Sequence, residues 1–236
     1  MTTPTPLRPT FDPSDPTPEI PSTRQLIQTL QLNPHPEGGY YAETDRSPQR
    51  VPNPFAHQNP STHSDPSALL VSTRSACTSI HYLLTPASPL GHFHRNKGRT
   101  VHTLHRGRGR YVIIHADEVA STSCPGGYSR AVDLPESRRW TGEARVETFV
   151  VGQDVESGER LQWVVEGGKY KASFLLEDDG VAAEGKGGKA SEGLLISETV
   201  VPGFEFEDHD FLGRERLGAL VGEERAGELG WMVRRE

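Results

Sequence analysis

Cysteine, methionine and long apolar runs are scarce in this chain. Two cysteines, Cys77 and Cys124, among 236 residues cannot make a disulfide framework, and they fit a reducing intracellular compartment. No apolar stretch approaches the roughly 20 residues needed to cross a bilayer. The N-terminus also lacks the apolar core of a signal peptide. We therefore predict a cytoplasmic protein with no membrane partner.

An excess of positive charge is also missing. The chain has 25 Lys and Arg against 32 Asp and Glu, which gives a net charge of −7. This balance argues against a general nucleic-acid partner. One run, "HRNKGRTVHTLHRGRGR", is locally basic. Such a run is usually a solvated face, and the alternative is a local anion site.

Glycine and proline are plentiful, with 24 and 19 residues. They separate short runs rich in β-branched and aromatic residues, among them "CTSIHYLLT", "TVHTLHR", "RYVIIHA", "YKASFLLE" and "LLISETVV". Many short strands with turn signals between them predict an all-β sandwich or barrel.

The two ends of the chain differ from its middle. Residues 1–21 are rich in Pro, Thr and Asp, so we predict a disordered tail that is dispensable for folding. A short helix is predicted after Ser22 and must end before Pro34. Residues 22–213 are predicted to form the main domain. Residues 214–236 form an extension with the apolar spacing of a helix.

The histidines concentrate between Gly91 and His115, in "GHFHRNKGRTVHTLHRGRGRYVIIH". Alternate side chains of a strand share a face, so we expect His92 and His94 on one face and Phe93 on the other. His102 can face them from the next strand. Three imidazoles in one place could hold a divalent metal, move protons near neutral pH, or be idle polar wall residues.

Four segments resemble one family in their order along the chain. They are the histidine stretch and "HPEGGYYAETDRS", "VGQDVESGERLQWVVEGGKYKA" and "ETVVPGFEFEDHDF". Together they resemble the cupin_5 family, also called DUF985. This resemblance implies a cupin double-stranded β-helix, a jelly-roll barrel with a ligand cavity in its mouth, and a homodimer. The wider fold family includes sugar epimerases and isomerases, dioxygenases and storage proteins, so the fold alone does not choose a reaction.

The chain departs from the metal-binding pattern of cupins. The glutamate of that pattern falls on Thr100, next to Arg99, and the histidine of its second half falls on Lys171. An ammonium does not ligate a metal unless it loses its proton. We therefore predict no bound cofactor. His92, His94 and His102 remain the candidate ligands if a divalent metal is present.

Six residues are the candidate site. His94, Glu43 and His102 are predicted to move protons, and Arg46, Gln162 and Tyr170 to hold a small-molecule substrate. For Glu43 the competing interpretation is solvated surface charge, and for Tyr170 it is core packing.

Three functions follow from these residues. The first is a small-molecule-binding cupin that works as an isomerase or epimerase on a sugar-like or polar organic substrate. The second is a metal-dependent cupin such as a dioxygenase. The third is a non-catalytic binding or storage-like module.

Overall fold

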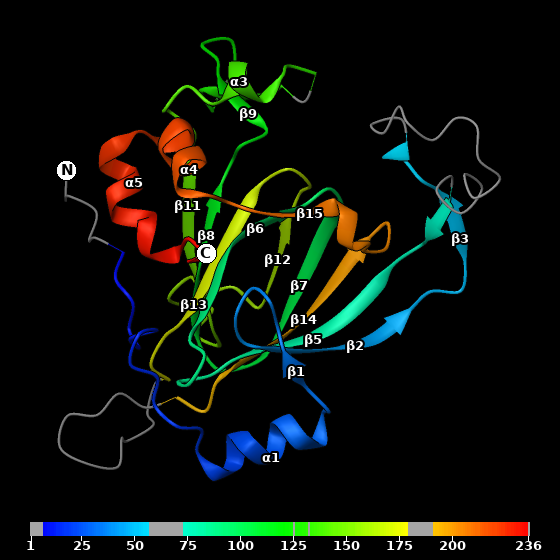
Figure 1. The fold of residues 1–236 in the computed structure, drawn as a ribbon, viewed down its shortest axis with the longest axis vertical. Helices are drawn as coiled ribbons and strands as arrows, with labels where there is room; N and C mark the ends of the chain where they lie inside the picture. The colour runs from blue at the N-terminus through cyan, green and yellow to red at the C-terminus, as the bar shows by residue number, and fades with distance from the viewer. Residues whose placement is uncertain (1–6, 57–72, 125, 132, 179–190, 236) are drawn as a thin grey trace.

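The structure, a computed structural model, describes residues 7–56, 73–124, 126–131, 133–178 and 191–235. Two antiparallel sheets face each other (Figure 1). The larger has six strands: β1 (Asn33–Pro34), β2 (Tyr40–Arg46), β5 (Thr78–Leu84), β14 (Leu194–Val201), β7 (Arg99–Arg106) and β12 (Gln162–Val165). The smaller has five: β11 (Val146–Val151), β8 (Gly109–Ile114), β13 (Tyr170–Leu175), β6 (Leu90–Asn96) and β15 (His209–Phe211).

The strand order is not the chain order. β14 lies between β5 and β7, and β13 lies between β8 and β6. Such crossovers are the mark of a jelly roll, so the all-β barrel prediction is confirmed. Two further pairs stand apart from the main sheets: β3 (Arg50–Pro52) with β4 (Thr73–Ser75), and β9 (Glu118–Ala120) with β10 (Tyr128–Arg130).

Strand β13 shows how the sequence builds two layers of core. All six of its residues are buried, because both faces of the strand are covered. Tyr170, Ala172 and Phe174 face a layer of helices, whereas Leu175 packs between the two sheets. Period-2 alternation thus places the basic side chain of Lys171 inside the barrel.

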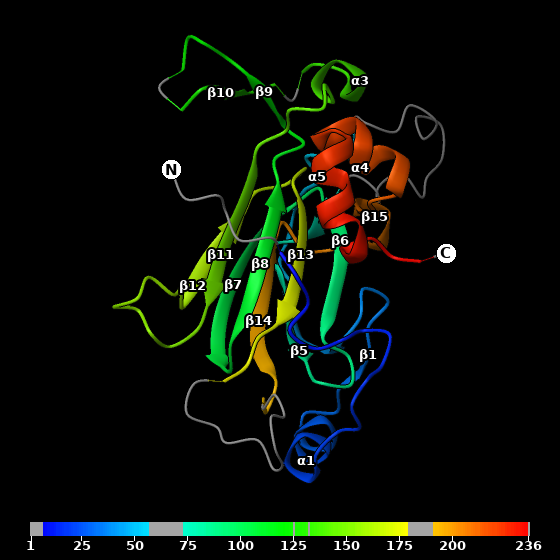
Figure 2. The same ribbon diagram turned by 90° about the vertical axis from the view of Figure 1, so that its left-hand side faces the viewer.

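Helices from the C-terminal residues cover the outer face of the smaller sheet (Figure 2). They are α4 (Arg214–Val221), α5 (Glu223–Leu229) and the 3-10 turn η4 (Gly230–Met232). Leu217, Leu220 and Leu229 are buried in the same cluster as Phe93. The short helix α3 (Glu136–Arg139) lies near β9. No helix in the described ranges is long and apolar enough to cross a membrane.

The N-terminal segment differs from the disorder that its composition predicts. Leu7 and Phe11 are buried in the two main core clusters. The Leu7 N–H donates to Glu228 Oε1, and Trp231 Nε1 donates to the Leu7 carbonyl. Two isolated apolar side chains anchor this Pro-rich segment, and composition averaged over 21 residues hides them. Residues 1–6 of the predicted tail lie outside the described residues.

The predicted short helix is present as α1 (Pro21–Thr29), and it ends before Pro34 as its sequence requires. Leu26, Ile27 and Leu30 pack against a third cluster at the edge of the larger sheet. Cys77 and Cys124 are both free thiols, which agrees with the absence of a disulfide framework.

Candidate functional site

A cavity of about 300 Å³ lies between β2, β5 and β14 on one side and residues 204–211 on the other. In Figure 1 these residues form the orange stretch that leaves β14, passes through the 3-10 turn η3 (Phe206–Asp208) and continues as β15. The walls are mainly apolar and aromatic: Tyr41, Ile80, Val200, Phe204, Phe206 and Phe211. The polar lining comes from His35, Glu37, Glu198 and His209, with Glu43 and Arg46 on β2.

Glu37 is the centre of the polar lining. It lies between β1 and β2, and its side chain contacts three imidazoles. His209 Nε2 donates to Oε1 at 2.8 Å, while His94 Nε2 and His35 Nδ1 lie 3.2 and 3.6 Å from Oε2. Burial alone would raise the pKa of Glu37, but these imidazoles bring the pKa down to about 2. Glu37 is therefore a buried carboxylate at neutral pH.

His94 lies behind this carboxylate, as an inward-facing side chain of β6. Its Nδ1 donates to the His92 carbonyl at 2.8 Å, since a carbonyl oxygen can only accept. Burial lowers the pKa of His94 to about 4, against the opposing effect of Glu37. At neutral pH its Nε2 is therefore an unprotonated nitrogen that faces a carboxylate oxygen. Two unprotonated acceptor atoms therefore lie 3.2 Å apart, where they can share a proton that a ligand supplies.

His92 and His94 do not face the same way, so this prediction is wrong. Lys171 pairs with His94 and Ser173 with Gly91, so β6 carries one extra residue opposite β13. This β-bulge breaks the alternation. His92 is turned toward the C-terminal turn, where its Nδ1 donates to the Met232 carbonyl at 3.3 Å. Phe93 lies in the helix-covered core as expected.

Gly91 explains the local geometry of the bulge. A Cβ at this position would come within 2.6 Å of the Tyr82 hydroxyl. That hydroxyl donates to the Gly38 carbonyl and so fixes the loop that carries Glu37. Glycine at position 91 thus lets β6 approach the tyrosine that orders this loop.

Lys171 and His102 form a second polar group inside the barrel. Lys171 is 3% exposed, and its Nζ donates to His102 Nε2 at 2.9 Å and to Glu198 Oε2 at 2.5 Å. His102 stacks on Trp163 with ring centroids 5.0 Å apart. Burial would raise the pKa of Glu198, but Lys171 and His102 hold it well below its usual range. His102 therefore accepts a hydrogen bond from Lys171 inside the barrel, and Glu198 is the member of this group that lines the cavity.

The residues at the cupin metal positions do not fit a metal. His92 points away, Arg99 forms an ion pair with Glu166 at 3.0 Å, and Lys171 holds a buried ammonium. His92, His94 and His102 are not brought together. Two other groups in the described ranges have ligand atoms within 4.8 Å of one another: Glu37, His94 and His209, and His115, Asp117 and Glu118.

Glu43 and Arg46 both line the cavity, as the sequence led us to expect, but they are paired with each other. Arg46 donates from Nη2 to Glu43 Oε2 at 2.8 Å and from Nε to Oε1 at 3.1 Å. Their side chains are 44% and 39% exposed, so the pair lies at the rim of the cavity. Glu43 is far more exposed than Glu37.

Gln162 and Tyr170 do not line this cavity. Gln162 is exposed on β12 and donates to Thr103 Oγ1 at 3.3 Å, because Trp163 and Val165 take the inward face of that strand. Tyr170 faces the helical layer, donates to Asp210 Oδ1 at 2.9 Å and lies under Arg95. Core packing is its role here.

Four polar residues of the cavity lining were missed as candidates: His35, Glu37, Glu198 and His209. All four fall inside the segments that carry the family resemblance. Glu198 stands in the apolar run "LLISETVV", where an isolated charge in a buried strand is a signal for an internal partner. No pattern in the sequence shows that Glu37 and His209 meet, since 172 residues separate them.

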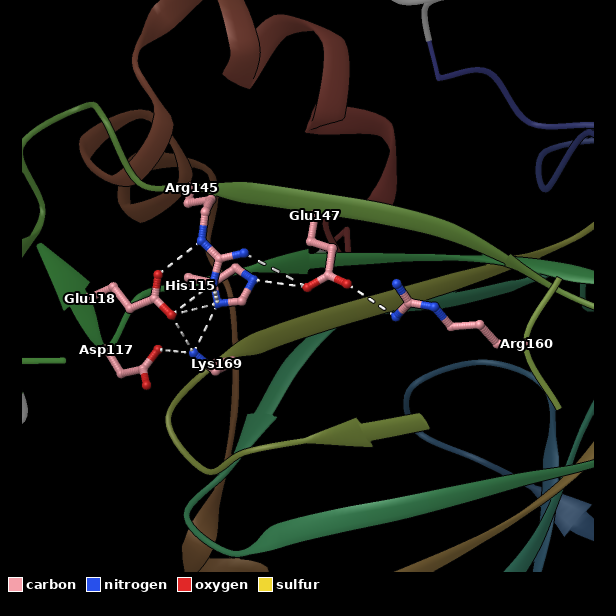
Figure 3. Close-up of polar contacts among 7 residues, drawn as sticks. All are labelled: His115, Asp117, Glu118, Arg145, Glu147, Arg160 and Lys169. Atoms are coloured by element: carbon pink, nitrogen blue, oxygen red, sulfur yellow. Dashed lines mark hydrogen bonds and ion pairs between the residues drawn. The ribbon is translucent and has the colours of Figure 1, made fainter. Parts of the chain in front are cut away.

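A separate ionic network lies where β8 ends and β13 begins (Figure 3). Lys169 Nζ donates to Asp117 Oδ1 at 2.7 Å, to Glu118 Oε1 at 3.1 Å and to His115 Nδ1 at 2.8 Å. Arg145 also donates to Glu118, and Arg160 to Glu147. Burial would raise the pKa of Glu118, but Arg145 and Lys169 bring it down to about 2.

Comparisons with known proteins agree with this architecture. Residues 24–212 match the family model described as Cupin superfamily (DUF985). The uncharacterized protein YML079W of Saccharomyces cerevisiae is 42% identical over 222 residues, which is 92% of this chain and 90% of that protein.

Two solved structures extend the agreement to the fold. A hypothetical protein from Leishmania major is 29% identical with a TM-score of 0.60, covering 90% of this chain and 98% of that one. Protein SO0799 from Shewanella oneidensis has a TM-score of 0.57 at 23% identity, covering 90% and 97%. The family match spans most of the chain, and this chain therefore belongs to the DUF985 family of the cupin superfamily.

Proposed function

We propose that this chain binds a small polar organic molecule in its cavity and moves a proton on it, as an isomerase or epimerase does. One observation carries the proposal. Glu37 is an ionised, buried carboxylate that lines the cavity beside the unprotonated Nε2 of His94. A base in this setting can remove a proton from a carbon next to a carbonyl group.

The neighbouring residues have distinct parts in this reaction. Glu37 accepts the proton on a carboxylate oxygen, and His94 Nε2, 3.2 Å away, stabilises it there by sharing it. His209 donates to the other carboxylate oxygen and so orients Glu37. The same proton returns to the opposite face of the carbon or to its neighbour, so that no oxidant or reductant is consumed.

The remaining candidates act at a greater distance from the reacting carbon. His102 and Lys171 hold Glu198 ionised on the cavity wall. Glu43 and Arg46 form a polar rim through which a substrate enters. We also retain the homodimer that the family resemblance implies, which light scattering of the purified protein tests, and the cytoplasmic location.

Deuterium exchange tests the proposed function. The purified protein is incubated in D2O with aldoses, ketoses and amino sugars, and incorporation at carbon is followed by NMR. We expect exchange with at least one compound, its loss in Glu37→Gln, and no loss in the control Glu156→Gln, which changes an exposed turn. Exchange that survives Glu37→Gln, or no exchange with any compound, contradicts the proposal.

A further inference from the structure

The charge partners of the buried carboxylates single out Glu37. Five carboxylate side chains are buried in the part of the chain that the structure describes: Glu37, Asp117, Glu159, Glu198 and Asp208. Four of them form an ion pair with a lysine or arginine: Asp117 with Lys169, Glu159 with Arg108, Glu198 with Lys171 and Asp208 with Arg74. Glu37 has histidines alone within ion-pair distance.

These histidines do not fully balance the charge of Glu37. Burial lowers the pKa values of His35 and His94, so both rings are neutral at pH 7. Lys171, whose charge also acts on Glu37, is already in contact with Glu198. Arg46 at the rim contacts two carboxylates, Glu43 and Glu205. A buried charge that is only partly balanced is costly, so the cavity favours a cation.

The walls show which kind of cation fits. The rings of Phe206 and Phe204 have centroids 5.4 Å apart, and those of Phe204 and His209 6.3 Å. Phe211 continues this wall at 4.7 Å from His209. Phe206 is 75% exposed, although a phenyl ring gains from burial. Aromatic faces attract organic ammonium groups, and they offer no ligand atoms to a bare metal ion.

We propose that the cavity takes a small organic amine in its protonated form, with the ammonium at Glu37 and the apolar body against Phe204, Phe206 and Phe211. The proposal rests on the proposed function and names its substrate class. The acceptor that meets the ammonium is the Glu37 carboxylate, which lines the cavity, and the unprotonated His94 Nε2 behind it adds no positive charge. A neutral hydroxyl compound could donate one hydrogen bond there, but it would leave the charge of Glu37 unbalanced.

Three probes of one shape test this inference. Benzylamine, benzyl alcohol and benzoate differ mainly in charge, and their dissociation constants are measured by ligand-observed NMR at pH 7 with EDTA present. We expect benzylamine to bind about tenfold tighter than benzyl alcohol, and benzoate to bind weakest. Equal affinities, tighter binding of benzoate, or no detectable binding of benzylamine overturns the proposal.

Variants locate the binding. Glu37→Gln should abolish the preference for the amine over the alcohol, whereas Phe206→Ala should weaken both probes to a similar extent. The control Glu156→Gln should change neither. A preference that survives Glu37→Gln overturns the proposed position of the ammonium. If Glu37→Gln does not fold, the order of the three dissociation constants measured on the unchanged protein still tests the preference for a cation.

This experiment measures binding of an unreactive amine, so it can fail separately from the proposed function. Deuterium exchange on a neutral sugar, together with equal affinity for the three probes, would leave the proton-transfer function standing and remove the amine. Preferred binding of benzylamine without any deuterium exchange would support the amine site and contradict the proton-transfer function.

Discussion

Among the residues that the structure describes, two groups bring histidine and carboxylate atoms within metal-ligand distance of one another, and they differ in their counter-charges. The cavity group joins Glu37 to His35, His94 and His209. The network group of Figure 3 joins His115, Asp117, Glu118 and Glu147 to Lys169, Arg145 and Arg160. Both contain three residues spaced as metal ligands, yet only the network group includes fixed cations in contact with its carboxylates.

This difference indicates that the network group stabilises the fold, whereas the cavity group binds a ligand. In the network group three carboxylates meet three cations, and Arg130 adds a fourth at Asp117. Lys169 Nζ contacts the same three side chains that could ligate a metal, His115, Asp117 and Glu118. The charges of this group are therefore balanced without a bound ligand. The cavity group lacks such a cation beside an open space of about 300 Å³. A ligand is the missing partner in our account.

Removing Lys169 should have the largest effect on stability. Lys169→Met leaves Asp117 and Glu118 with fewer partners in a buried place, and we expect a loss of about 3–5 kcal/mol in the free energy of unfolding. Urea unfolding followed by tryptophan fluorescence measures it. The control Arg160→Gln removes a 43% exposed side chain and should cost less than about 1 kcal/mol. Similar values for both variants would show that the network is not a structural unit.

Acid should weaken the cavity group next, because burial gives His94 a lowered pKa in the folded protein. The pKa of His94 is about 4 in the folded protein and 6.5 as a model value. The unfolded chain therefore binds more protons between these values, and stability falls as the pH falls from 6.5 to 4. This contribution is on the order of 2–3 kcal/mol.

Other buried histidines add to the same slope, so a variant isolates the part that belongs to His94. In His94→Gln, unfolding free energies measured at several pH values should decline less between pH 6.5 and 4. An unchanged slope would mean that His94 is already protonated in the folded protein. The carboxylates respond at lower pH. The pKa values of Glu37 and Glu118 are both about 2, so their contributions are present above 4.5 and lost only as the pH falls below that value.

A matched pair of Glu→Gln variants gives a smaller and more direct contrast. Glu118→Gln leaves Arg145 and Lys169 short of an acceptor charge, and we expect a loss of about 2 kcal/mol. Glu37→Gln removes a charge that has no fixed partner, and it should change stability by less than about 1 kcal/mol. A larger loss at Glu37 than at Glu118 would reverse the assignment of the two groups.

Chelation should have no measurable effect. We expect EDTA to leave the melting temperature of the purified protein unchanged, because the cupin metal positions carry Thr100 and Lys171 and the network is balanced by Lys169. Scanning fluorimetry checks this. A large fall that one added ion restores would instead identify Glu37, His94 and His209 as a metal centre.

The sequence predicts the fold well and the site in part. Period-2 alternation, turn residues and the four family segments are local signals, and they lead to the jelly roll. They also place His94 inside the barrel and Glu43 and Arg46 at the cavity. His92 is misplaced because a single-residue bulge, held open by Gly91, is invisible to a pattern that assumes regular alternation.

The rest of the site depends on long-range pairing. Gln162 points outward because the larger Trp163 takes the inward face of β12, and burial of the indole outweighs that of an amide. Glu37 meets His209 only because β15 pairs with β6 and brings it alongside His94. Such contacts follow from sheet topology, which one sequence does not encode in local patterns.

The central claim is that the cavity, and not the network, needs a cationic ligand. A crystal structure of the protein soaked in benzylamine tests it most directly. The account predicts the amine in the cavity, with its nitrogen within hydrogen-bond distance of Glu37 and its ring against Phe204, Phe206 or Phe211, and the contacts of Lys169 unchanged. An empty cavity, or an amine at Asp117 or Glu118 with Lys169 displaced, would contradict it.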